Sequence, residues 1–224
     1  MERLHFTVAA SDEEVSAIWE TPSNGEPRAT LVFAHGQAVG MDHPFMKMGA
    51  NCLANEGIAT FRFNFPYMET GRETSDPFPT LVDAFRSAAE AASTKTTGEP
   101  LLAGGKSLGA RVAAEAAGQG ILPDILGLVF FGFPIHAPDN PTTSRGTALR
   151  THSLPLLFLQ GSLDPFARVN LMQALCEDLG SRATLYVIDG GGHSFEYPES
   201  DGIPTSETME LVSAAVANWV ESLI

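Results

Sequence analysis

Residues 101–109 have the sequence LLAGGKSLG, in which Ser107 stands between Gly105 and Gly109. The stretch begins as a short apolar run and continues into the alanine-rich segment 108–117, so it predicts a buried strand, a tight turn and a helix. A serine on such a turn has an exposed hydroxyl, and glycines two positions to either side let the strand and the helix approach closely. The start of a helix also favours negative charge that develops nearby. The stretch therefore predicts that Ser107 is a nucleophile, with a helix-capping serine as the alternative.

A serine nucleophile needs a base, and the base needs an acid that orients it. With the serine on a strand-to-helix turn, the usual chain order is Ser, then Asp or Glu, then His. Among the histidines that follow Ser107, His193 is the one late enough for this order, and it follows three glycines that leave the turn sterically open. We assign the acid to Asp164, which follows the apolar run 156–160. Asp189 is the rival, and Asp164 could instead cap a helix that starts at Pro165.

Two backbone N–H groups are expected to stabilise negative charge on the substrate oxygen. One belongs to Leu108, directly after the nucleophile, and the other to the loop that follows the apolar run 31–34, where Gln37 is the best candidate. His35 in this loop could form a metal site with Asp42 and His43, but the spacing is poor. We expect His35 to stabilise the loop by hydrogen bonding, and we expect no metal.

Short apolar runs alternate with helical patterns along the chain. The runs are apolar on both faces, as in parallel strands covered by helices. Between them lie segments with apolar residues every three or four positions, as in helices. The sequence thus predicts an α/β fold, a single domain over residues 1–224, with a mostly parallel sheet of about eight strands and helices on both faces. The expected strands are 4–9 and 15–20, as an antiparallel opening pair, then 31–34, 58–63, 101–103, 125–131, 156–160 and 185–188. The expected helices lie around 45–52, 81–89, 108–117, 171–179 and 209–219, the last after Pro204 and Thr205 as start signals.

The chain carries 27 acidic and 13 basic residues and a formal net charge of −14. No basic footprint for nucleic acid is visible, and no apolar run is long enough to cross a membrane. The first residues lack the apolar region of a signal peptide, so a cytoplasmic protein is expected. The two cysteines, Cys52 and Cys176, have no metal-ligand spacing. The expected partner is a small molecule with an acyl group, and the oligomeric state stays open.

The interval 132–155 is too short and too rich in Pro, Thr, Ser and Gly to form a separate lid over the strand ends. We therefore expect no cap domain and a shallow, open cleft that suits short acyl groups. Its predicted rim consists of residues on the loops after the strands, namely Met41, Tyr67, Met68, Phe133, His136 and Phe166.

These motifs resemble those of the α/β-hydrolase superfamily, and within it the small dienelactone-hydrolase-like branch that includes a regulatory subunit of the NSL histone-acetyltransferase complex. The resemblance covers most of residues 31–195. It departs from the pattern at Ala110, where glycine is common, and at Ser107, where dienelactone hydrolases proper have cysteine. The stretches that carry it are 35–36, 40–46, 62–68, 104–109 with Arg111, 161 with 164–166, and 192–195.

The resemblance implies hydrolysis of an ester or related acyl compound without a cofactor. Two other readings remain. The chain could be a binding module that retains the fold, as the resemblance to the NSL subunit suggests, although a scaffold has no need for a serine, a histidine and an aspartate in this order. The same residues would also serve thioester cleavage or perhydrolysis, which sequence does not distinguish.

Overall fold

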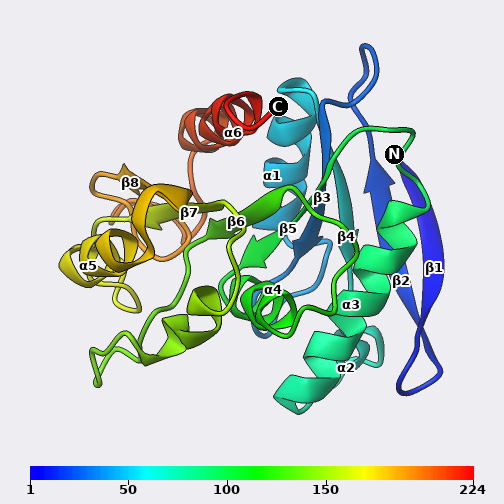
Figure 1. Ribbon diagram of the computed structural model, residues 1–224, viewed down its shortest axis with the longest axis horizontal. Helices are drawn as coiled ribbons and strands as arrows, with labels where there is room; N and C mark the ends of the chain where they lie inside the picture. Colours follow the sequence, from blue (N-terminus) through cyan, green and yellow to red (C-terminus); the bar gives the residue numbers. More distant parts are fainter.

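The computed structural model describes residues 1–224, and its centre is one eight-stranded sheet (Figure 1). The strand order is β1-β2-β4-β3-β5-β6-β7-β8. The opening pair β1 and β2 is antiparallel, β2 also runs antiparallel to β4, and all other neighbours are parallel. The mostly parallel sheet with an antiparallel opening pair is therefore confirmed. The strands are β1 (Glu2–Val8), β2 (Glu13–Glu20), β3 (Ala29–Ala34), β4 (Ile58–Phe63), β5 (Leu101–Lys106), β6 (Gly127–Phe131), β7 (Leu156–Gly161) and β8 (Ala183–Ile188).

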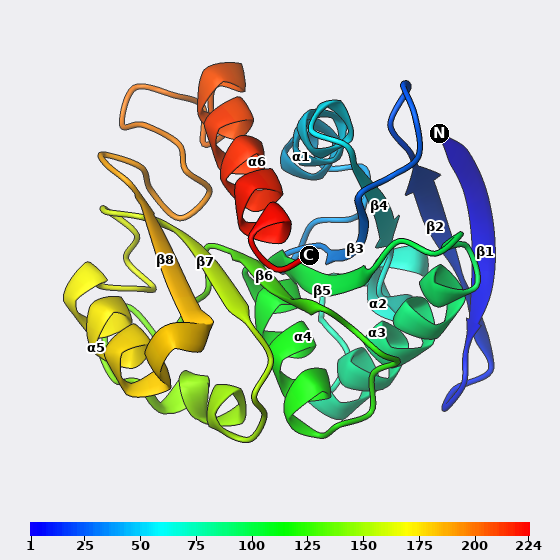
Figure 2. The same ribbon diagram turned by 45° about the horizontal axis from the view of Figure 1, so that its top comes forward.

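Helices cover both faces of the sheet, as predicted. In Figure 2, α1 and α6 lie on one face, and α3, α4 and α5 lie on the other. Each face has its own apolar cluster, one of 20 buried residues under α1 and α6, and one of 37 against the opposite helices. None of the helices is long and apolar enough to span a bilayer. The helices are α1 (Pro44–Asn55), α2 (Pro66–Glu69), α3 (Phe78–Ser93), α4 (Leu108–Gly118), α5 (Val169–Leu179) and α6 (Ser206–Glu221), with 3-10 turns η1 (Ser144–Arg150) and η2 (Gly180–Arg182).

The inner strands β3 to β7 are buried along their whole length, which explains why their sequences are apolar without alternation. The expectation of two covered faces is wrong for the last strand. Tyr186 and Val187 of β8 are 38% and 37% exposed, because β8 forms the edge of the sheet and is only partly covered.

The start signal of α6 is confirmed, since the Thr205 hydroxyl accepts a hydrogen bond from the backbone N–H of Thr208.

The interval 132–155 forms no additional domain. It contains an isolated bridge between Ala137 and Asn140 and the 3-10 turn η1. The helix after β7 begins at Val169 and not at Pro165, so Asp164 does not cap it. Because β5, β6, β7 and β8 run parallel, the carboxyl ends of β5, β7 and β8 lie on the same side of the molecule, where their loops can meet.

Candidate active site

Ser107 lies on a sharp turn between β5 and α4. Its backbone has φ 54° and ψ −109°, a left-handed conformation that costs a non-glycine residue about 1–3 kcal/mol. The neighbouring glycines make this turn possible. A Cβ on Gly105 would lie 2.6 Å from the carbonyl oxygen of Ala34, and one on Gly109 would lie 2.5 Å from the same oxygen. The helix therefore packs directly on the end of β3, and the serine hydroxyl is held above the strand ends.

Three side chains from three different loops form one hydrogen-bonded chain. The Nε2 atom of His193 lies 2.8 Å from the Oγ atom of Ser107, and its Nδ1 atom lies 2.7 Å from the Oδ2 atom of Asp164. The carboxylate of Asp164 must accept, so Nδ1 carries the proton and the Nε2 lone pair faces the serine hydroxyl. The structure thus brings together the three residues that the sequence selected.

Asp164 is almost fully buried and makes further hydrogen bonds that orient it. Its Oδ1 atom accepts from the backbone N–H of Phe166 at 2.7 Å, and its Oδ2 atom also accepts from the side-chain amide of Gln160. The rival acid, Asp189, instead accepts from the Ser162 hydroxyl at 3.2 Å. Asp164 is therefore the carboxylate in contact with the imidazole.

The imidazole of His193 is mostly buried beside the ring of Phe166, with 4.7 Å between the ring centroids. Burial lowers the pKa of His193, the hydrogen bond to Asp164 opposes this effect, and the positive charge of Lys106 lowers the pKa further. The imidazole is consequently neutral at pH 7, the state in which Nε2 can accept a proton from Ser107.

His35 ties the loop after β3 to the loop after β4. Its Nδ1 atom is 2.7 Å from the carbonyl oxygen of Gly36, and its Nε2 atom accepts from the backbone N–H of Phe65 at 3.0 Å. Burial lowers the pKa of His35 to about 4, which keeps the ring neutral. The loop-stabilising role predicted for His35 is confirmed. Asp42, its candidate metal partner, instead forms ion pairs with Arg3 and Lys47.

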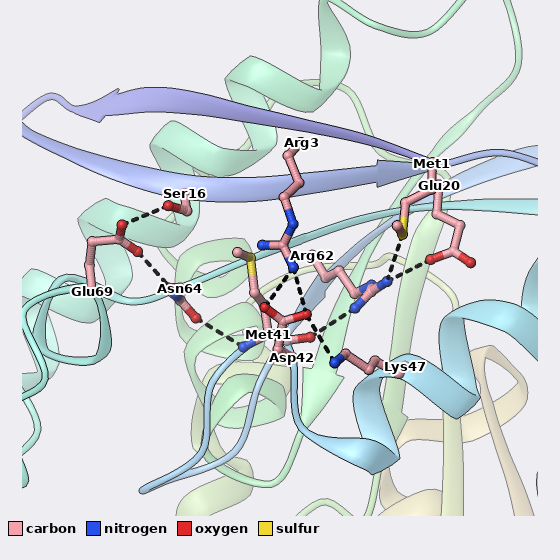
Figure 3. A network of polar contacts seen from close by, with 10 residues as sticks. All are labelled: Met1, Arg3, Ser16, Glu20, Met41, Asp42, Lys47, Arg62, Asn64 and Glu69. Carbon is pink, nitrogen blue, oxygen red and sulfur yellow. Dashed lines mark hydrogen bonds and ion pairs between the residues drawn. The ribbon is translucent and has the colours of Figure 1, made fainter.

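A polar network holds the loop after β3 in place at Met41 and Asp42 (Figure 3). The side chain of Asn64 accepts from the backbone N–H of Met41 at 2.9 Å, and Arg62 donates to the carbonyl oxygen of Met41 at 3.0 Å. Arg62 is buried and paired with Glu20 at 2.6 Å. Sequence reasoning assigned no role to Glu20, Arg62 or Asn64. A charged arginine inside the apolar run 58–63 was the available signal, because buried charges need partners.

The hydrogen-bonded chain opens into a cavity of about 430 Å³. Ser107 and His193 line it together with Gln37 and Leu108, whose N–H groups were predicted to receive negative charge. The remaining lining residues are Gly36, Val39, His43, Phe45, Met46, Lys106, Arg111, Pro134, Arg145, Phe166, Ser194 and Gly202.

Most of the predicted rim is wrong. Of its six residues, Phe166 alone lines the cavity. Tyr67 and Phe133 are fully buried in the larger apolar cluster, and Met68 packs against that cluster. Met41 is buried, and its backbone belongs to the polar network of Figure 3. His136 is also buried, and its ring nitrogens make hydrogen bonds with the carbonyl oxygen of Ala137 and the backbone N–H of Arg168. Tyr67, Met68 and Phe133 follow the strands in sequence, but their side chains pack into or against the core.

Sequence reasoning missed three cations that do line the cavity, Lys106, Arg111 and Arg145. The spacing from Ser107 was the available signal for two of them. Lys106 precedes the serine, and Arg111 follows it by four residues, which places it one helical turn along α4. Arg145 comes from η1, and no local pattern connects it with the serine.

The fold and this site define an α/β protein with a serine, a histidine and an aspartate aligned at the carboxyl edge of a mostly parallel sheet. The model of one protein family, the alpha/beta hydrolase domain, matches residues 27–221. The chain therefore belongs to the alpha/beta hydrolase family.

Solved structures with the same fold cover nearly the whole chain. A dienelactone hydrolase from Anabaena variabilis has a TM-score of 0.74 and 19% sequence identity, with 100% of this chain and 98% of that chain covered. An esterase domain from Rhodothermus marinus has a TM-score of 0.74 and 17% identity, with 99% and 98% covered. A serine hydrolase without a lid from Xanthomonas campestris has a TM-score of 0.74 and 18% identity, with 99% and 94% covered. At these identities the likeness establishes the fold.

Proposed function

We propose that this protein is a serine hydrolase that cleaves a small ester or related acyl substrate through a covalent acyl-enzyme. The observation that carries the proposal is the hydrogen-bonded chain from Ser107 through His193 to Asp164, open to a cavity at the serine. A neutral imidazole that contacts the serine hydroxyl on one side and a buried carboxylate on the other is the arrangement that activates a serine at neutral pH. The similarity to an esterase domain and to serine hydrolases supports this reading.

In the first half of the reaction, the Oγ atom of Ser107 attacks the carbonyl carbon while Nε2 of His193 takes the hydroxyl proton. Asp164 holds the imidazole in the required tautomer and stabilises its positive charge. Negative charge develops on the carbonyl oxygen, and the backbone N–H groups of Leu108 and Gln37 are its proposed donors. His193 then passes the proton to the leaving alcohol as the carbon–oxygen bond breaks.

In the second half, water attacks the acyl carbon and His193 again acts as the base. The bond to Ser107 breaks, the serine recovers its proton, and the carboxylic acid leaves. Each step uses side chains and N–H groups of this chain, so the proposal needs no cofactor. Thioesters and peracids would pass through the same intermediate, so the leaving group is a matter for substrate screening.

A fluorophosphonate probe tests the proposal directly, because it reacts covalently with serines that a neighbouring base activates. We expect one equivalent of probe on Ser107 in the native protein and none in Ser107→Ala. The matched control is Ser162→Ala, since Ser162 contacts Asp189 outside the cavity and its loss should leave labelling intact. A folded native protein that stays unlabelled would favour the binding-module alternative.

The size of the cavity predicts a preference for short acyl groups. A cavity of about 430 Å³ accommodates a small ester, and the interval 132–155 supplies no further domain to cover a long chain. Methylene groups beyond the cavity would stay in water and add no binding energy. We expect kcat/KM for p-nitrophenyl acetate or butyrate to exceed that for the dodecanoate at least about tenfold. A preference for the dodecanoate, measured below its micelle concentration, would contradict this prediction.

A further inference from the structure

The positive charges of this protein fall into two groups. Eight of the 13 lysines and arginines form an ion pair with a carboxylate. The five that do not are Lys106, Arg111, Arg145, Arg168 and Arg182. With 27 acidic residues in the chain, carboxylates are plentiful, so a cation without one is the exception and calls for an explanation.

Three of these five cations line the cavity at Ser107, and no aspartate or glutamate lines it with them. The cavity is therefore a locally positive site in a protein whose formal net charge is −14. Such a contrast attracts anions to the cavity, while the rest of the surface repels them.

Arg111 and Arg145 lie near each other at one side of the cavity. The guanidinium of Arg111 lies over the ring of Phe78, with its Cζ atom 5.1 Å from the ring centroid, and it donates no hydrogen bond within the protein. Arg145 donates to the carbonyl oxygen of His136 at 2.9 Å, which leaves other N–H groups of its guanidinium free. Burial is the main cause that lowers the pKa of Arg111, and repulsion from the positive charge of Arg145 lowers it further.

The nearest carboxylate does not neutralise this pair. Glu115 follows Arg111 by one turn of α4 and partly offsets its charge, yet the two form no ion pair, and the Glu115 carboxylate accepts from the Gln119 amide at 2.9 Å. Two guanidinium groups with free N–H groups and no shared carboxylate match the two oxygens of a bound oxyanion.

Lys106 adds a third positive charge to the cavity. Lys106 is only 5% exposed. Its ammonium group makes no hydrogen bond or ion pair and lies 5.6 Å from the ring centroid of Phe45. Burial lowers the pKa of Lys106 to about 8, so the group remains mostly charged at pH 7. The nearby carboxylates already have other partners, Asp164 with His193 and Glu196 with the backbone N–H of Ser194.

We propose that the substrate of this site carries an oxyanionic group, a carboxylate or a phosphate, which Arg111 and Arg145 bind while Lys106 contributes positive charge across the cavity. This inference rests on the proposed hydrolase function for the ester that is cleaved, but the anion subsite itself does not depend on catalysis. Half-esters of small dicarboxylic acids and phosphate-bearing esters are the two substrate classes that it admits.

The preference for a carboxylate-bearing substrate is tested by comparing the hydrolysis rates of two esters of equal acyl length, p-nitrophenyl hemiadipate and p-nitrophenyl hexanoate. We expect the native protein to favour the hemiadipate in kcat/KM by about tenfold or more, because charge-assisted hydrogen bonds form only with the anion. Arg111→Met and Arg145→Met should each lower that ratio about tenfold, whereas Arg168→Met, which removes an unpaired arginine outside the cavity, should leave the ratio unchanged. Added salt should reduce the native ratio through screening.

Binding measurements keep the subsite testable if hydrolysis fails. The Ser107→Ala protein is titrated with monoethyl adipate and, separately, with glycerol 3-phosphate, by calorimetry. At least one of these anions should bind, and Arg111→Met should weaken that binding about tenfold. Arg111-dependent binding without hydrolysis of either ester would support the subsite and reject the hydrolase. Ser107-dependent hydrolysis of the neutral ester, with no preference for the hemiadipate and no Arg111-dependent binding of either anion, would overturn the subsite and keep the hydrolase.

Discussion

Replacing Ser107 with alanine should lower kcat for p-nitrophenyl butyrate by about 10⁴-fold or more. The substitution removes the one oxygen that lies 2.8 Å from Nε2 of His193, so the covalent route is lost. The cavity and the proposed N–H donors remain, and binding of the substrate should change little. The measurement is the steady-state rate against substrate concentration, with protein purified away from contaminating esterases.

The control for this experiment exploits the backbone strain at the same residue. Ser107 has φ 54°, so alanine keeps the strain and Ser107→Gly should relieve it and raise the free energy of unfolding by about 1 kcal/mol. Both variants should be inactive although one is at least as stable as the native protein. Activity close to the native level in either variant would remove Ser107 from the mechanism.

Asp164→Asn should lower kcat by about 10³- to 10⁴-fold, the second largest effect that we expect. A carboxylate can only accept from Nδ1 of His193, whereas an amide can present its NH₂ group there and favour the tautomer whose Nε2 carries the proton. In that tautomer the imidazole cannot take the proton of Ser107. The loss should be smaller than for Ser107→Ala, because serine and imidazole remain in contact.

The matched control is Asp189→Asn, which changes a carboxylate of the neighbouring loop in the same way. Asp189 contacts the hydroxyl of Ser162 and not the imidazole, so its substitution should alter kcat by less than about threefold. The two variants are compared on one ester, with thermal unfolding to verify that both are folded. Equal losses in the two variants would show that the carboxylate acts through loop structure and not through the imidazole.

Local patterns in the sequence were sufficient to predict the strands of the sheet and the turn at Ser107. The five inner strands are apolar on both faces because helices cover both sides, and this pattern is readable from the residues alone. The turn was recognisable because Gly105 and Gly109 are required sterically by the carbonyl of Ala34. The edge position of β8 was missed, since the four consecutive apolar or aromatic residues 185–188 look the same in an edge strand and an inner one.

The acid of the site shows where chain order stops being informative. Asp164 and Asp189 both follow a strand and precede His193, and order alone left Asp189 as a rival. The distance of 2.7 Å between Asp164 and His193 separates them. It depends on how β7 and β8 lie side by side, which no short stretch of sequence contains.

The sequence by itself determined the fold class, the serine turn and the order of serine, acid and histidine, because these depend on steric and apolar patterns within a few residues. Only the tertiary structure decided which side chains face the cavity. Tyr67 and Phe133 turn into the core, while Lys106, Arg111 and Arg145 converge on the serine from β5, α4 and η1. The physical reason is that a side chain on a loop takes its direction from the elements packed around it, and these come from distant parts of the chain.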